Sequence, residues 1–137
     1  MTTVLVDTNV LSETVRSRPS EAVLGWLAAH PSFAVSVITL DELALGIERL
    51  EGKRRARLRE WLDHLRDDVD PEIIPIDAET ALAAGSLRAA RERRGRRVAQ
   101  ADMLIAATAL VRGLTLATRN VEDFEGCGVA LLNPFDV

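Results

Sequence analysis

Four acidic residues stand where the predicted strands and helices begin or end. Asp7 directly follows the apolar residues 4–6, and Glu42 lies close to the start of a predicted helix. Asp102 lies in the first turn of another predicted helix, and Asp123 comes after a predicted strand. Carboxylates that converge repel one another unless an ion of double positive charge neutralises them. The four positions therefore predict a site for a divalent metal.

Asp7 and Glu42 also have purely structural interpretations. Asp7 could cap the helix that follows its strand, although Asn9 could do the same. The run Thr39-Leu40-Asp41-Glu42 has the pattern of a capping box, in which a glutamate bonds back to the residue that begins the helix, and Asp41 competes with Glu42 for either role. Ligands in open α/β sheets bind beyond the carboxyl ends of strands, so the acid at the strand end is the stronger functional candidate.

Asp102 and Asp123 are weaker candidates when each is considered alone. Asp102 opens a segment, residues 101–112, that is apolar nearly all round and is therefore predicted to be a buried helix. Its structural interpretation is a favourable interaction with the helix dipole. Asp123 lies in the polar stretch 118–124, where an acid is usually only solvated. The shared location of all four acids at element ends is the stronger argument for a site.

Apolar runs alternate with helical patterns along the chain, which predicts an α/β fold with a mostly parallel sheet between helices. Strands are expected at residues 2–7, 33–37, 73–76, 114–118 and 129–132. Helices are expected at residues 20–30, 39–51, 53–67, 77–94 (or from 80) and 101–112. The helices between residues 39 and 67 are predicted to form an antiparallel hairpin. Pro75 indicates that the third strand lies at a sheet edge or is weakly paired at that position.

Length and composition predict one globular domain over residues 1–137. The chain has 137 residues, of which 47% are hydrophobic, enough for a substantial core. No apolar stretch approaches the roughly 20 residues of a membrane span, so no membrane association is expected. The one cysteine, Cys127, cannot form an internal disulfide, which fits a reducing cytoplasm. His30 and His64 are isolated, so no zinc site is predicted.

The basic residues are concentrated although the net charge is −4. Of 17 lysines and arginines, five lie in residues 53–59 and five in residues 91–97. A mildly acidic protein can still bind a polyanion, because charges act locally and are screened over about 8–10 Å. Each segment could contact nucleic-acid phosphates or form only a solvated helix surface.

Several stretches together resemble the PIN domains, and more narrowly the VapC or FitB type of toxin ribonuclease. They are VLVDTNVLSE (4–13), SVITLDELALGIERL (36–50), ADMLIAATALVRGLTLATRNVEDF (101–124) and the terminal NPF. The motif DTN after a strand is weak alone, but the ordered combination is specific. The resemblance implies a Rossmann-like α/β/α sandwich around a central parallel sheet.

The resemblance also implies which residues form the site. Its catalytic and metal-binding acids correspond to Asp7, Glu42, Asp102 and Asp123, with Asn120 competing with Asp123 for the fourth position. The implied substrate-binding or supporting residues are Thr8, Asn9, Thr118, Arg119 and Asn120. The implied cofactor is Mg²⁺, with Mn²⁺ as a possible substitute.

By the same resemblance the expected activity is metal-dependent hydrolysis of RNA phosphodiester bonds by a toxin. The expected partners are the RNA substrate, a VapB-like antitoxin that docks on the hairpin at 39–67, and a second copy of the chain within a larger complex. The alternative is a PIN-like module that binds RNA or protein without cleaving it. The four intact acids favour the enzyme.

Overall fold

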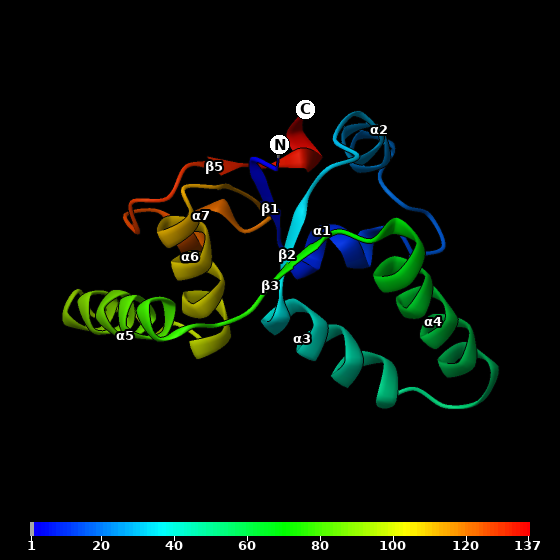
Figure 1. Ribbon diagram of the computed structural model, residues 1–137, viewed down its shortest axis with the longest axis horizontal. Helices are drawn as coiled ribbons and strands as arrows, with labels where there is room; N and C mark the ends of the chain where they lie inside the picture. The colour runs from blue at the N-terminus through cyan, green and yellow to red at the C-terminus, as the bar shows by residue number, and fades with distance from the viewer. Residues whose placement is uncertain (1) are drawn as a thin grey trace.

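The computed structural model describes residues 2–137 and contains a five-stranded sheet in which every pairing is parallel (Figure 1). The strand order is β3-β2-β1-β4-β5. The strands are β1 (Val4–Val6), β2 (Ala34–Ser36), β3 (Glu72–Ile74), β4 (Thr115–Ala117) and β5 (Leu131–Leu132). The predicted α/β fold with a parallel sheet is confirmed, and the strands are shorter than expected.

Helices connect the strands in the expected order. They are α1 (Thr8–Glu13), α2 (Glu21–Ala29), α3 (Val37–Glu48), α4 (Gly52–His64), α5 (Ala78–Arg93), α6 (Gln100–Arg112) and α7 (Val121–Phe124). A π-helical turn, Leu65–Val69, extends α4, and a 3-10 turn, Pro134–Asp136, follows β5. No helix within residues 2–137 is long and apolar enough to cross a membrane.

The sheet separates two hydrophobic clusters, which makes a three-layered molecule. Alternate side chains of a strand point to opposite faces. Accordingly Val4 and Val6 pack with the apolar residues of α1 and α2, whereas Leu5 packs with those of α6. Figure 1 shows α5 and α6 on one side of the strands and α1, α2 and α4 on the other. The site must therefore lie at the ends of the strands, because both faces of the sheet are covered.

Two local predictions are confirmed by the backbone. β3, which precedes Pro75, is an edge strand, where a residue without an N–H costs no sheet hydrogen bond. Helix α6 is buried along most of its length and ends at Gly113, whose φ of 67° is unfavourable for residues with a side chain.

Helix α3 begins earlier than predicted, which removes the capping-box interpretation of Glu42. Its N-cap is Ser36, whose hydroxyl accepts from the Ile38 N–H at 3.1 Å. Thr39 therefore lies inside the helix, and Glu42 is too far along it to bond back to the first residue. The predicted start at Thr39 was wrong because Ser36 ends β2 and caps α3 at once, without an intervening loop.

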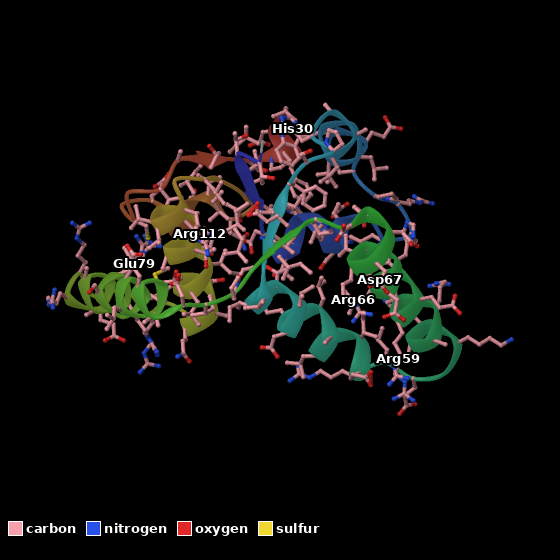
Figure 2. The ribbon with its side chains drawn as sticks, in the orientation of Figure 1. His30, Arg59, Arg66, Asp67, Glu79 and Arg112 are labelled. Carbon is pink, nitrogen blue, oxygen red and sulfur yellow. The ribbon has the colours of Figure 1, made fainter. Side chains whose placement is uncertain are left out.

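Helices α3 and α4 form the expected hairpin (Figure 1). Arg59 of α4 donates through its Nε to Glu48 of α3 at 2.7 Å, and its second nitrogen bonds to the same carboxylate. Figure 2 labels Arg59 close to where the two helices are joined. This contact shows which face of α4 is directed toward α3.

Candidate active site

The strand order creates a crevice beside Asp7. From β1 the chain proceeds to β2 and β3 on one side and then returns to place β4 on the other side. The segments that leave β1 and β4 therefore diverge, and ligands in such sheets bind at this switch point. Asp7 follows β1 and Thr118 follows β4, and the Asp7 N–H donates to the Ala117 carbonyl at 2.9 Å. The two strand ends are held together at the crevice.

Asp7 is buried and surrounded by hydrogen-bond donors. Its side chain accepts from the Thr118 hydroxyl at 2.8 Å, the Thr8 N–H at 2.8 Å and the Asn9 side chain at 3.3 Å. Burial raises the pKa of Asp7, these three bonds oppose the rise, and the charge of Glu42 adds to it. Asp7 also caps α1, so its structural interpretation is correct. The cap uses one of its oxygens, while the other bonds to Thr118 and Asn9.

Glu42 is held toward Asp7 by a pair of threonines. The Thr8 hydroxyl donates to Glu42 Oε1 at 2.7 Å and lies 3.1 Å from the Thr39 hydroxyl. Thr39 is completely buried and Thr8 is half-buried, so this contact lies at the boundary between the core and the pocket. The sequence interpretation of Thr39 as a helix cap missed its actual place beneath the site.

Asp102 completes a group of acids that interact electrostatically. It lies in the first turn of α6. Burial raises the pKa of Asp102 to about 6, and the charges of Asp7, Glu42 and Asp123 contribute to the rise in that order. No arginine or lysine forms an ion pair with any of these four carboxylates within residues 2–137. The repulsion is therefore left for a ligand to neutralise.

A pocket of about 530 Å³ joins most of the predicted site residues. Its lining includes Asp7, Thr8, Asn9, Glu42, Asp102, Arg119 and Asn120. Thr118 is completely buried beneath it. The Asn120 N–H donates to the Thr118 hydroxyl at 3.1 Å, and the Arg119 N–H donates to Asn9 at 3.1 Å. The loop after β4 is thereby tied to the segment after β1.

Asp123 lies apart from the other acids. It is exposed on α7 and lines a neighbouring hollow together with Asn120 and Arg119. The polar loop expected around it is in fact this short helix, and the Asp123 carbonyl accepts from the buried Arg91 at 2.6 Å. Asn120 lines the pocket directly and Asp123 influences it through its charge. The role of Asp123 stays a prediction.

Three residues that the sequence analysis did not identify also line the pocket: Ser12, Glu13 and Arg16. Ser12 and Glu13 follow Asn9 by three and four positions, which is the spacing of one helix face, and Arg16 lies three residues beyond the end of α1. The helical spacing after Asn9 could therefore have identified Ser12 and Glu13 if a helix had been assumed directly after Asp7. Arg16 lies 3.6 Å from Glu13, so a positive charge stands at the rim of an acidic pocket.

The oxygen atoms of the pocket suit a hard divalent cation. Mg²⁺ is commonly held by one or two carboxylates together with waters and substrate phosphates. Among the residues that the structure describes, no three acidic, histidine or cysteine side chains form a group that could hold an ion by themselves. A cation held by Asp7 and Asp102 would therefore need water or substrate oxygens to complete its coordination.

The comparison with known families agrees with this geometry. A family model described as PIN domain matches residues 4–125, and the chain belongs to that family. The resemblance seen in the sequence is thereby confirmed.

Particular relatives are similar over nearly the whole chain. The protein is 37% identical over 136 residues to Toxin FitB of Neisseria gonorrhoeae, covering 96% of this chain and 98% of the relative. It is 33% identical over 140 residues to VapC ribonuclease Y4jK of Sinorhizobium fredii, covering 97% and 98%. The crystal structure of FitAcB from Neisseria gonorrhoeae superposes with a TM-score of 0.86 at 35% identity, covering 98% of this chain and 99% of that one.

Proposed function

We propose that this protein is a metal-dependent endoribonuclease of the VapC and FitB toxin type. The observation that carries the proposal is the convergence of Asp7, Glu42 and Asp102 on one pocket at the switch point of the sheet. Relatives named as a VapC ribonuclease and as Toxin FitB support the choice of RNA as substrate and of toxin as biological role.

Asp7 and Asp102 would hold the principal cation, Mg²⁺ or Mn²⁺. Glu42 and Asp123 would bind through water or hold a second ion. When bound, such a cation lowers the pKa of a water and neutralises charge on the phosphate. Burial and mutual repulsion both raise the pKa of Asp102, so a cation that neutralises the pocket also favours the ionised form needed to bind it.

The neighbouring polar residues position these acids and the substrate. Thr118, Thr8 and Asn9 fix the Asp7 side chain through three hydrogen bonds, and Thr8 also fixes Glu42. Arg119 and Asn120 line the pocket on exposed backbone after β4, where they can contact the phosphates beside the cleaved bond. A side chain held before the substrate arrives needs no reorganisation during reaction.

Neither histidine is placed to act as a general acid or base in the pocket. His30 Nδ1 lies 2.8 Å from the Trp26 carbonyl at the end of α2, and His64 Nδ1 lies 2.7 Å from Asp68. Neither histidine lines the pocket. The chemistry must therefore depend on carboxylates and on what they bind.

An antitoxin partner and a homodimer are part of the same proposal. The similar crystal structure is of FitAcB, and another similar structure, 27% identical with a TM-score of 0.84, is described as DNA-bound VapBC from Salmonella typhimurium. The α3–α4 hairpin remains our candidate surface for the antitoxin, since α3 exposes Leu45 among charged neighbours.

The test is cleavage of structured RNA by the purified protein with Mn²⁺ or Mg²⁺. We expect cleavage that EDTA abolishes and that Asp7→Asn lowers by about 10²-fold or more, as for loss of a main electrostatic group. The cation should also raise the Tm of the wild type and raise that of Asp7→Asn much less.

Two outcomes would contradict the proposal. Undiminished metal-dependent cleavage by Asp7→Asn would exclude the assigned site. Retained RNA binding without cleavage under every cation tried would instead favour the non-catalytic module.

A further inference from the structure

A second, larger hollow of about 1190 Å³ opens beside the acidic pocket. It lies between the segment after α1, helix α4 and the 3-10 turn near the C-terminus. Glu13, Arg16 and Arg119 line both cavities, so the hollow and the pocket adjoin each other.

The lining of the hollow is strongly basic, and we name it the arginine groove after its five arginines: Arg16, Arg18, Arg54, Arg57 and Arg119. Glu13 is its one lining acid. The Glu13 carboxylate is mostly buried and is already engaged by the Ser20 N–H at 2.8 Å and by Arg16 at 3.6 Å.

Most of these arginines have no acidic partner. Within residues 2–137, Arg18, Arg54, Arg57 and Arg119 form no ion pair, and all four are exposed. By contrast Arg59, on the face of α4 directed to α3, is paired with Glu48. The positive charge of the groove is therefore available to a ligand of negative charge.

Two aromatic side chains lie among the arginines. Trp61 of α4 and Phe135 of the C-terminal turn are partly exposed and line the groove. The Arg119 guanidinium lies over the Phe135 ring, 4.8 Å from its centroid. Arginines that follow a backbone, together with aromatic or guanidinium planes on which bases stack, are the combination used to bind single-stranded nucleic acid.

We propose that the arginine groove binds an unpaired RNA segment next to the phosphodiester bond that is cleaved. The inference rests on the proposed ribonuclease function and adds to it the conformation and the path of the substrate. Arg54, Arg57 and Arg18 contact phosphates along the groove, while Arg16 and Arg119 contact those at its junction with the acidic pocket.

Electrostatics explains why a nuclease needs such a groove. The carboxylates of the pocket repel an RNA chain until a cation is bound. Exposed charges are screened beyond about 8–10 Å, so attraction must come from groups close to the pocket. Arg16 and Arg119 line both cavities and supply positive charge where the two adjoin.

The second basic segment, residues 91–97, provides a matched control. None of its arginines lines the groove or the pocket. Arg93 and Arg97 are exposed and form no ion pair within the described chain. Replacing them removes the same charge as replacing Arg54 and Arg57.

The experiment compares Arg54→Gln/Arg57→Gln with Arg93→Gln/Arg97→Gln, each in the full chain carrying Asp7→Asn and kept in EDTA. Fluorescence anisotropy measures binding of a fluorescein-labelled unpaired RNA of about 12 nucleotides, within the range of single-strand sites. We expect the first pair to weaken binding about tenfold or more and to reduce the slope of log K against log salt by about 1.4, the value for two lost phosphate contacts on a single strand. The second pair should behave as the parent does.

Separate outcomes judge the groove and the ribonuclease proposal. Equal affinities and salt slopes for the two pairs would overturn the groove, whatever the wild type cleaves. Tighter binding of a duplex of the same length would exclude an unpaired ligand. Unchanged RNA binding by Arg54→Gln/Arg57→Gln with loss of poly-glutamate binding would show that the groove takes an acidic protein segment, which also contradicts the proposal. Absence of cleavage by the wild type would count against the ribonuclease alone.

Discussion

The acidic pocket and the arginine groove are neighbours with opposite construction. Asp7 is buried and held by three hydrogen bonds, whereas Arg54 and Arg57 are exposed and unpaired within residues 2–137. The pocket thus holds negative carboxylates in fixed positions, and their repulsion lowers the stability of the folded protein. The groove holds positive arginines whose repulsion is screened by water. Side chains that take part in chemistry must be held in fixed positions, as the carboxylate of Asp7 is. Side chains that only attract a long flexible ligand can remain exposed, as the arginines are.

The comparison predicts that the pocket, unlike the groove, opposes folding at neutral pH. The folded-state pKa of Asp102 is about 6, above its ordinary value of 3.8, so the folded state holds this proton more tightly. Protonated Asp102 therefore contributes to the stability of the folded state below about pH 4, and this contribution is lost as the pH rises through about 6. A pKa raised from 3.8 to about 6 corresponds to about 3 kcal/mol in the free energy of unfolding. Because Asp102 is partly exposed, solvent screening reduces the expected effect to about 1–2 kcal/mol.

Asp102→Asn should accordingly lower RNA cleavage by about 10²-fold or more while raising the Tm at pH 7.5 without metal. Thermal unfolding between pH 4 and 7.5 checks the sign: the wild type should lose stability over this range relative to the variant. Arg54→Gln/Arg57→Gln is the control, because its exposed side chains should not change the pH dependence. A variant Tm below that of the wild type at pH 7.5 would contradict the assigned repulsion.

A smaller effect is expected at the threonine that links two acids. Thr8→Val removes the donor to Glu42 and the contact with Thr39, and cleavage should fall about tenfold, the size of one lost hydrogen bond to a charged group. Thr108→Val is the matched control, because within residues 2–137 the Thr108 hydroxyl bonds only to the Leu104 carbonyl of the same helix, α6. Steady-state cleavage at several Mn²⁺ concentrations separates weaker cation binding from slower reaction. Equal losses in both variants would indicate a general loss of stability instead.

These residues also show what the sequence could predict. Asp7 and Asp102 could be placed because a strand or a helix begins or ends beside each, and such ends follow from local hydrophobic patterns. The role of Thr39 could not be predicted, since TLDE also fits a capping box and only the contact with Thr8 distinguishes the two. A local pattern placed the element ends at Asp7 and Asp102 but misplaced the start of α3, and it does not show which side chains from different elements meet.

The basic segments show the same limit for surfaces. Residues 53–59 and 91–97 look equivalent in the sequence, and of the two segments only 53–59 contributes residues to the arginine groove. Even within 53–59 the faces differ, because Arg57 lines the groove while Arg59 is bound to Glu48. Which arginines meet a ligand depends on how α4 packs, and that packing is set by distant residues.

Comparing Arg57 with Arg59 therefore tests, with the smallest expected effect, whether the groove differs from the surface around it. The two arginines lie two positions apart on α4, both are exposed, and neutralising either one changes the net charge equally. Arg59→Gln breaks an exposed ion pair, so the Tm should fall by no more than about 2 °C. Its salt slope for RNA binding should stay at the parent value, whereas Arg57→Gln should lower it by about 0.7. Equal slopes would mean that RNA responds to the charge of the whole helix, and the distinction between groove and surrounding surface would then be lost.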